Sequence, residues 1–181
     1  MPLLDRDHEL KAQRFREALL ELVDARLVQA EANGTVGQIL DEPADTAARM
    51  AALLPVGNPF DEMIGPFYDI AGAQALLGLS KSGVIKRLNN GEVIAAQLED
   101  SARSWVFPTW QFSPASATLV DGMTEVWKTL LTQADRWTAA LWMRARSADL
   151  GGVTVVDWLT AGHPVETAIA LAQRDAARWA A

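Results

Sequence analysis

The chain has 181 residues and a formal net charge of −7 at pH 7, and half of its residues are hydrophobic. It contains no cysteine, which excludes disulfides, thiolate metal sites and a cysteine nucleophile. The apolar runs are too short to cross a bilayer, and charged residues begin at Asp5, where the apolar core of a signal peptide would lie. We therefore expect a cytoplasmic protein without a membrane partner.

The charge is spread unevenly along the chain. Residues 1–65 carry 6 basic and 12 acidic side chains, residues 66–112 carry 4 of each, and residues 113–181 carry 6 and 7. An acidic protein is not attracted to DNA by its overall field, so any contact with nucleic acid must come from a local patch. The middle third is the place to look for one.

The N-terminal segment, residues 1–62, is predicted to be helical. Apolar residues at three- and four-residue spacing predict a long helix over residues 4–32, and Asn33-Gly34 ends it. The stripe consists of Phe15, Leu19, Leu22, Val23, Leu27 and Ala30. It can form the seam of a homodimer or pack on the rest of the protein. A second helix is expected over residues 45–54, before Pro55 and Gly57.

Residues 63–113 predict a winged helix-turn-helix domain. A short helix over residues 71–77 with Asp69 as its N-cap is followed by a turn at Gly78 and a second helix that Ser80 caps. Two short runs rich in β-branched and aromatic residues, 93–98 and 104–107, then predict a β-hairpin with Arg103 in its turn. Helix, glycine turn, helix and hairpin is the layout of this fold.

The outer face of the second helix carries cations and amides but no acid until Glu92. Lysine and arginine neutralise phosphates, whereas arginine and asparagine suit the edges of guanine and adenine. The candidate DNA-binding residues are Ser80, Lys81, Ser82, Lys86, Arg87, Asn89, Asn90 and Arg103. Because such units also serve as protein–protein adaptors, that reading stays open.

Residues 114–181 predict a C-terminal helical domain, and the whole chain is expected to be mostly α. Apolar residues at helical spacing recur from Val126 to Trp142. A short helix is expected over residues 153–160, and a final helix runs from Val165, with Val165, Ile169, Ala172, Ala176 and Trp179 as its apolar stripe.

Two motifs resemble a known family. Residues 70–81, IAGAQALLGLSK, resemble the first half of a MerR- or excisionase-like winged helix, and residues 106–112, VFPTWQF, resemble the "FPxWQF" signature that follows it in a group of bacterial proteins. The order Leu141-Trp142, Leu150-Gly151-Gly152, Thr154, Trp158-Leu159 and Gly162 is similar to the toxin-binding domain of Xre–MbcA–ParS antitoxins. The family's Thr-Pro step is Thr154-Val155 here.

The resemblance implies an antitoxin that covers the nucleotide cleft of a RES-domain toxin, an enzyme that degrades NAD. It also implies possible homodimers and repression of the protein's own promoter through operator DNA. The matching toxin-binding positions are Leu150, Gly151, Gly152, Arg174, Arg178 and Trp179. The alternative function is a stand-alone transcription regulator or excisionase-like DNA-binding protein.

The sequence predicts no catalytic or metal site and no cofactor. His8 lies among acids that a helix N-terminus favours, and His163 has no second ligand at metal-binding spacing. No Ser-His-Asp set can be assembled, and the glycines do not match a phosphate-binding loop. We therefore expect a protein that acts by binding and is not an enzyme.

Overall fold

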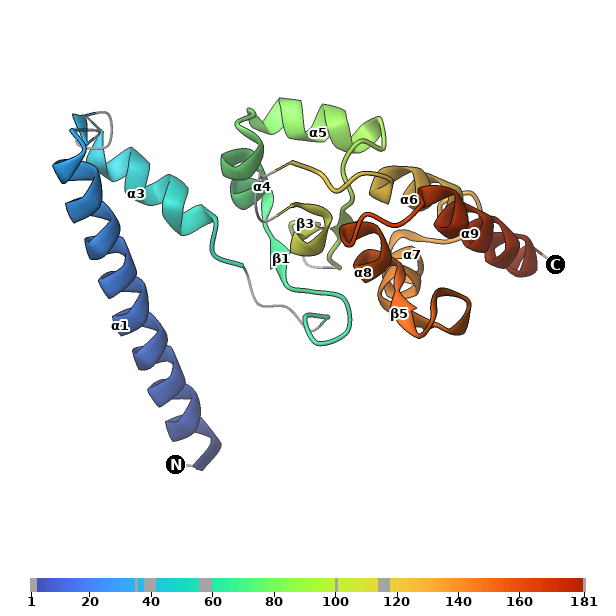
Figure 1. Ribbon diagram of the computed structural model, residues 1–181, viewed down its shortest axis with the longest axis horizontal. Helices are drawn as coiled ribbons and strands as arrows, with labels where there is room; N and C mark the ends of the chain where they lie inside the picture. Colours follow the sequence, from blue (N-terminus) through green and yellow to red (C-terminus); the bar gives the residue numbers. More distant parts are fainter. Residues whose placement is uncertain are drawn as a thin grey trace. The chain divides into compact units, whose positions relative to one another are not determined.

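A computed structural model describes residues 3–34, 36–37, 42–55, 60–99, 101–113 and 118–180, with only the backbone given for residues 3–8. The chain divides into two compact units, Met1–Ala47 and Ala48–Ala181. The fold is mostly α-helical with small antiparallel sheets, as the sequence predicts (Figure 1).

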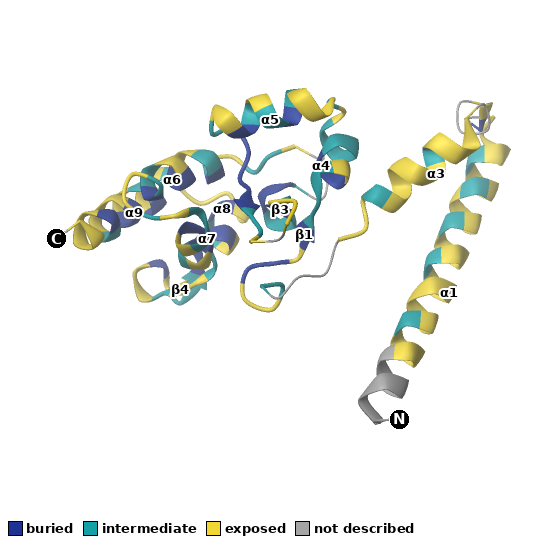
Figure 2. Cartoon of the chain, turned by 180° about the vertical axis from the view of Figure 1, so that it is seen from behind, coloured by how far each residue is buried: buried dark blue, intermediate teal, exposed yellow. Residues whose placement is uncertain are grey.

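The first unit contains one long helix, α1 (Leu3–Ala32). It ends where Asn33-Gly34 was expected to end it, with Gly34 at a φ of +68°. Figure 2 shows α1 in the colours of exposed and half-buried residues, and no residue from 9 to 32 is buried. The next described helix, α3 (Pro43–Ala52), crosses into the second unit.

The second unit contains the helix-turn-helix. Helix α4 (Ile70–Leu77) starts at Asp69, whose carboxylate accepts from Gly72 N at 2.8 Å, and Gly78 ends it with a φ of +64°. Helix α5 (Lys81–Asn89) starts at Ser80, whose hydroxyl accepts from Gly83 N at 3.2 Å. Both predicted caps and the glycine turn are confirmed.

The packing between these helices differs from the expected pattern. The sequence predicts that Ala71, Ala75, Leu76 and Leu79 pack against Val84, Ile85 and Leu88. Leu79 and the three residues of α5 do share a cluster, but Ala71 is exposed, and the buried residues of α4 are Gly72 and Ala73. Ala73 packs in a core with Val84 and Leu88 of α5. Gly72 lies against the Ala52 carbonyl and the Tyr68 side chain, so a Cβ there would clash. The buried face of α4 is therefore shifted by one or two residues from the predicted face.

A three-stranded antiparallel sheet completes the winged helix. Its order is β1 (Phe67–Tyr68), β3 (Trp105–Pro108) and β2 (Ala96–Gln97), with Phe107 opposite Tyr68 and Val106 opposite Ala96. The hairpin β2–β3 was expected, whereas the pairing of β1 with β3 was not. A two-residue strand is too short for its alternation to be recognised in a sequence.

The remaining helices form a second layer of the same unit. They are α6 (Met123–Leu130), α7 (Arg136–Arg144), α8 (Val155–Thr160) and α9 (Val165–Trp179). Two short 3₁₀-helices are η1 (Thr109–Gln111) and η2 (Ala148–Leu150). Strand β4 (Arg146–Ser147) pairs with β5 (Val153–Thr154), so the short helix begins at Val155 and not at Val153 as expected.

One hydrophobic core joins the winged helix to these helices. Ile64, Phe67 and Ile94 from the first part lie in the same buried cluster as Trp127 and Leu171 from the second. The segments 63–113 and 114–181, which we expected to be separate domains, thus share their main core.

Within the described part of the chain, no helix has the length and apolarity needed to span a membrane.

Candidate nucleic-acid and partner interfaces

Helix α5 presents a polar face away from its core. Val84 and Leu88 are buried, whereas Lys81, Ser82 and Lys86 are exposed. Asn89 is also exposed, and Arg87 is half-buried. Among the residues that the structure describes, no salt bridge engages the three cations on this helix. Their charge is therefore available to an anionic partner.

Two of the predicted DNA-binding residues have structural roles. The Ser80 hydroxyl caps α5 and lies 3.0 Å from the Ser82 hydroxyl. The Asn90 amide donates to Glu92 Oε1 at 2.9 Å, just beyond the end of the helix. Ser80 and Asn90 are occupied at the two ends of the helix, so the better-supported contact set is Lys81, Ser82, Lys86, Arg87 and Asn89, here called the α5 face. Within this set, the Ser82 hydroxyl shares a hydrogen bond with Ser80.

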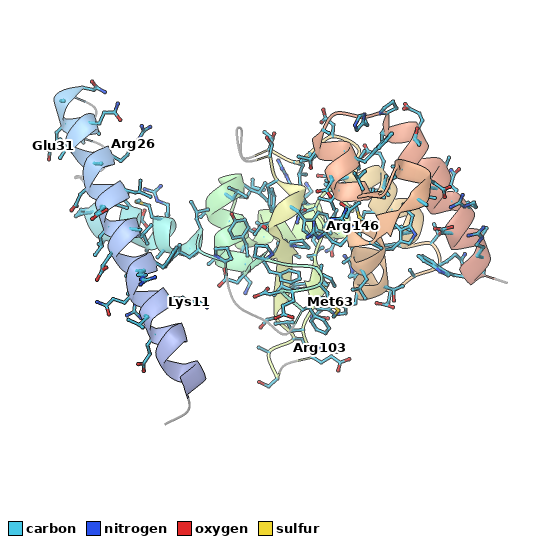
Figure 3. The ribbon with its side chains drawn as sticks, turned by 60° about the horizontal axis from the view of Figure 1, so that its bottom comes forward. Lys11, Arg26, Glu31, Met63, Arg103 and Arg146 are labelled. Atoms are coloured by element: carbon cyan, nitrogen blue, oxygen red, sulfur yellow. The ribbon has the colours of Figure 1, made fainter. Side chains whose placement is uncertain are left out.

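Arg103 lies in the turn between β2 and β3, as expected, and it is exposed. Figure 3 labels it at the outer end of this hairpin. Its φ of +48° is unusual for a residue with a side chain. Its carbonyl accepts from Gln97 Nε2 at 2.7 Å, which ties the turn to the strand. The β2–β3 hairpin, which is the wing of this fold, thus holds the Arg103 cation away from the core.

The segment that resembles the "FPxWQF" signature acts as a structural clamp. Gln111 is fully buried, accepts from Ile94 N at 2.7 Å and donates to the carbonyls of Ile94 at 2.7 Å and Pro108 at 3.0 Å. The Trp110 indole donates to the Ile64 carbonyl at 2.7 Å. The motif therefore fixes backbone groups of the winged helix and does not supply contact residues.

Helix α7 is bound to the wing by two further hydrogen bonds. Arg136 Nη1 donates to the Ala95 carbonyl at 3.0 Å, and the Trp137 indole donates to the Gln97 carbonyl at 3.0 Å. The Arg136 guanidinium also lies 5.3 Å from the centre of the Trp105 ring. Burial lowers the pKa of Arg136, yet an arginine keeps its charge in proteins. Sequence reasoning missed this link, because it joins residues about forty positions apart.

The structure brings most of the predicted toxin-binding residues together. Arg174 Nη2 lies 2.6 Å from Asp149 Oδ2, directly before Leu150, so α9 is joined to the Gly151-Gly152 turn. Asp175 pairs with Arg174 at 3.3 Å and with Arg178 at 3.2 Å. Asp149 and Asp175 thus neutralise Arg174 and Arg178. Neither aspartate was predicted from the sequence to take part in this site.

The members of this set differ in exposure. Leu150 is only 4% exposed and belongs to the core, so it shapes the turn and does not offer a contact. Gly151 and Gly152 have φ values of +73° and +85° with open space beside them. Trp179 is 41% exposed, so it lies outside the buried stripe of α9, where Leu171, rather than Trp179, is buried.

Desolvation raises the pKa of Asp175, but hydrogen bonds from Trp142 and Arg174 and the charges of Arg174 and Arg178 outweigh it, so the net pKa is lowered. The Trp142 indole donates to Asp175 Oδ2 at 3.0 Å. Asp175 is therefore a charged centre that joins α7 to α9. The name α9 face is used below for the surface that the turn and the final helix form together. It consists of residues 149–152 with Arg174, Asp175, Arg178 and Trp179.

His163 makes a ring contact with a tryptophan. The His163 ring stacks on Trp158 with ring centres 4.2 Å apart, which agrees with its predicted structural role. The side chain of His8 lies outside the described residues. Within the described ranges, no group of three or more histidine, aspartate or glutamate side chains is placed to hold a metal ion.

Comparisons with known proteins support the fold. No family model matches the sequence, and no curated protein matches it. Among solved structures, the NMR structure of Rv2175c is similar, with 22% identity, a TM-score of 0.53, and coverage of 67% of this chain and 85% of that one. At this identity the similarity concerns the fold alone.

Proposed function

We propose that this protein binds double-stranded DNA through the α5 face, with the wing as a second contact. The observation that carries this proposal is the position of Lys81, Lys86 and Arg87 on the second helix of a helix-turn-helix, where Lys81 and Lys86 are exposed and none of the three has a salt bridge to another described residue. In such units the second helix enters the major groove, and its N-terminal residues meet the base edges.

The residue types suit the two tasks of DNA recognition. Lys86 and Arg87 can neutralise phosphates, which supplies affinity without sequence information. Lys81 and Ser82 lie in the first turn of the helix, where base edges are met, and exposed Asn89 at its last residue can hydrogen-bond to the DNA backbone. Arg103 can reach the backbone or the minor groove from the wing. The acidic remainder of the chain confines binding to these elements.

The experiment measures binding of the whole protein to the DNA upstream of its own gene at several salt concentrations. Replacing Lys86 and Arg87 together with alanine removes two cations, so the slope of log affinity against log salt should fall by about 1.8. Arg103→Ala should reduce the slope by about 0.9 if the wing contributes one phosphate contact.

The matched control is the double variant Arg14→Ala/Arg16→Ala. It removes the same charge from exposed positions of α1 and should leave the slope unchanged. Equal weakening by both double variants would mean that only net charge matters, which contradicts a specific α5 face. Absence of binding by the native protein would favour the reading in which the winged helix holds another protein.

A second function is favoured by the α9 face. We propose that this face binds a partner protein, and the resemblance to Xre–MbcA–ParS antitoxins makes a RES-domain toxin the candidate. The supporting observation is that the turn and the final helix, far apart in sequence, are joined by the Arg174–Asp149 pair. Exposed ion pairs of this kind are screened by solvent and contribute little to stability, so a partner can displace them easily.

The test is co-expression with a neighbouring RES-domain protein. The native chain should form a complex and relieve growth arrest, whereas Trp179→Ala combined with Arg178→Ala should not. The Lys86→Ala/Arg87→Ala variant serves as the control and should still neutralise. Neutralisation by the α9 variant at native strength would exclude this face as the contact. Removing α9 entirely is not a clean test, because Ala168 and Leu171 belong to the shared core.

A further inference from the structure

A cavity of about 500 Å³ lies between the winged helix and the C-terminal helices, away from the α5 face and the α9 face. Its volume falls within the range of small-molecule sites. Tyr68, Trp110 and Phe112 line it from the winged-helix side, and Arg144, Asp157 and Thr160 from α7 and α8. Neither of the proposed functions uses these side chains.

Arg144 carries an unsatisfied donor at this cavity. Its Nε is sealed from solvent and has no hydrogen-bond partner among the described residues. A buried N–H without an acceptor is unfavourable, and native proteins rarely leave one. The indole nitrogen of Trp127 is also unpaired, but Trp127 is fully enclosed in the core and does not line the cavity. Arg144 thus joins a buried, unpaired group to the lining of the cavity.

The lining defines the chemistry of the missing partner. A guanidinium presents two parallel N–H groups that match the two oxygens of a carboxylate. Among the described residues that line the cavity, Arg144 is the one cation and Asp157 is the one acid. A singly charged anion therefore fits better than a doubly charged phosphate. The three aromatic rings provide a surface for a flat apolar body.

We propose that this cavity binds a small aromatic carboxylate, whose carboxylate pairs with Arg144 and whose ring lies against Tyr68, Trp110 and Phe112. The ligand would contact both halves of the unit at once. The proposal goes beyond DNA and partner binding and does not depend on either of them. The competing explanation is that water alone fills the cavity.

The experiment titrates the full-length protein with indole-3-acetate, phenylacetate and benzoate at up to millimolar concentration, by calorimetry and ligand-detected NMR. Indole-3-acetamide, which keeps the ring but lacks the charge, is the matched probe. Binding of at least one acid, with at least about tenfold weaker binding of its amide, is expected from the loss of one charge-assisted hydrogen-bond pair. The Trp110 indole N–H signal should shift on binding.

Arg144→Gln should weaken binding of the acid by about tenfold or more, whereas Arg16→Gln on exposed α1 removes the same charge and should bind like the native chain. Thr160→Trp fills the cavity from its rim and should abolish binding while leaving Arg144 in place. Circular dichroism melting confirms that each variant is folded. If no acid binds, if the amide binds as well as the acid, or if Arg144→Gln binds like the native chain, the proposal is wrong.

Discussion

Gln111 shows how a single buried polar side chain can stabilise the winged helix. Its amide satisfies both the N–H and the carbonyl of Ile94 and also the Pro108 carbonyl. Replacing Gln111 with leucine keeps a similar volume but leaves the buried Ile94 groups without partners. Each such group costs about 1–3 kcal/mol. We expect Gln111→Leu to lower the free energy of unfolding by at least about 2 kcal/mol in urea titrations, with Gln133→Leu at an exposed position as the control.

Asp135 gives a pH-dependent prediction at the same scale. A hydrogen bond from the Thr138 hydroxyl, followed by one from its backbone N–H, lowers the pKa of Asp135 below its ordinary value of 3.8. A depressed pKa means that the ionised carboxylate stabilises the folded state above pH 3.8, and this stability is lost as the pH falls below that value. As the N-cap of α7, Asp135 should contribute about 1 kcal/mol at pH 7.

The measurement compares the native chain with Asp135→Ala in urea at pH 7 and at pH 3. The difference in the free energy of unfolding should be smaller at pH 3, because below pH 3.8 the carboxyl of the unfolded chain is largely protonated and part of the advantage of the ionised cap is lost. A difference that grows at low pH would contradict the assignment of Asp135 as a charged cap.

At the scale of elements, features that depend on residues close together in the sequence could be predicted, whereas contacts between distant residues could not. Asp69, Ser80 and Gly78 act within three or four residues, so the bounds of α4 and α5 could be predicted closely. The partners of Arg136 and Arg174 lie 41 and 25 residues away, and no spacing in one sequence indicates them. The α5 face could be predicted because helical periodicity separates buried from exposed positions. The cavity at Arg144 could not, because it forms between distant segments.

Gly122 connects two elements through its backbone. It precedes α6 with a φ of +80°, and a Cβ there would collide with the Val165 side chain at the start of α9. Gly122→Ala should lower the free energy of unfolding by at least about 1–2 kcal/mol through the left-handed backbone alone. Adding Val165→Ala should recover only the steric part. Thermal unfolding of both variants checks this, and full recovery would mean that the backbone conformation carries no strain.

For the whole molecule, the open question of assembly concerns α1. Phe15 is 56% exposed and Leu22 is 70% exposed, whereas Leu19, Val23 and Leu27 are half-buried. Monomeric proteins rarely expose an apolar stripe of this kind, so the homodimer through α1 stays a prediction. It also suits DNA binding, because paired half-sites about 34 Å apart need two recognition helices.

Sedimentation of the native chain should give a dimer, and Leu19→Glu with Val23→Glu should give a monomer, because burying unpaired carboxylates in the seam is unfavourable. Glu17→Ala, at an exposed position of the same helix, should stay dimeric. A native monomer would exclude the seam. A dimer that survives the double variant would place the interface in residues 48–181.

The hydrogen bonds from Arg136 and Trp137 to the wing have a consequence for evolution and for protein design. Many DNA-binding modules are exchanged between proteins as cassettes, cut at the end of the wing. Here a cut after residue 113 would leave the Ala95 and Gln97 carbonyls without their donors and would open the core around Phe67 and Ile94. Recombination that preserves function should therefore transfer residues 60–180 together, and chimaeras should be joined before Phe60.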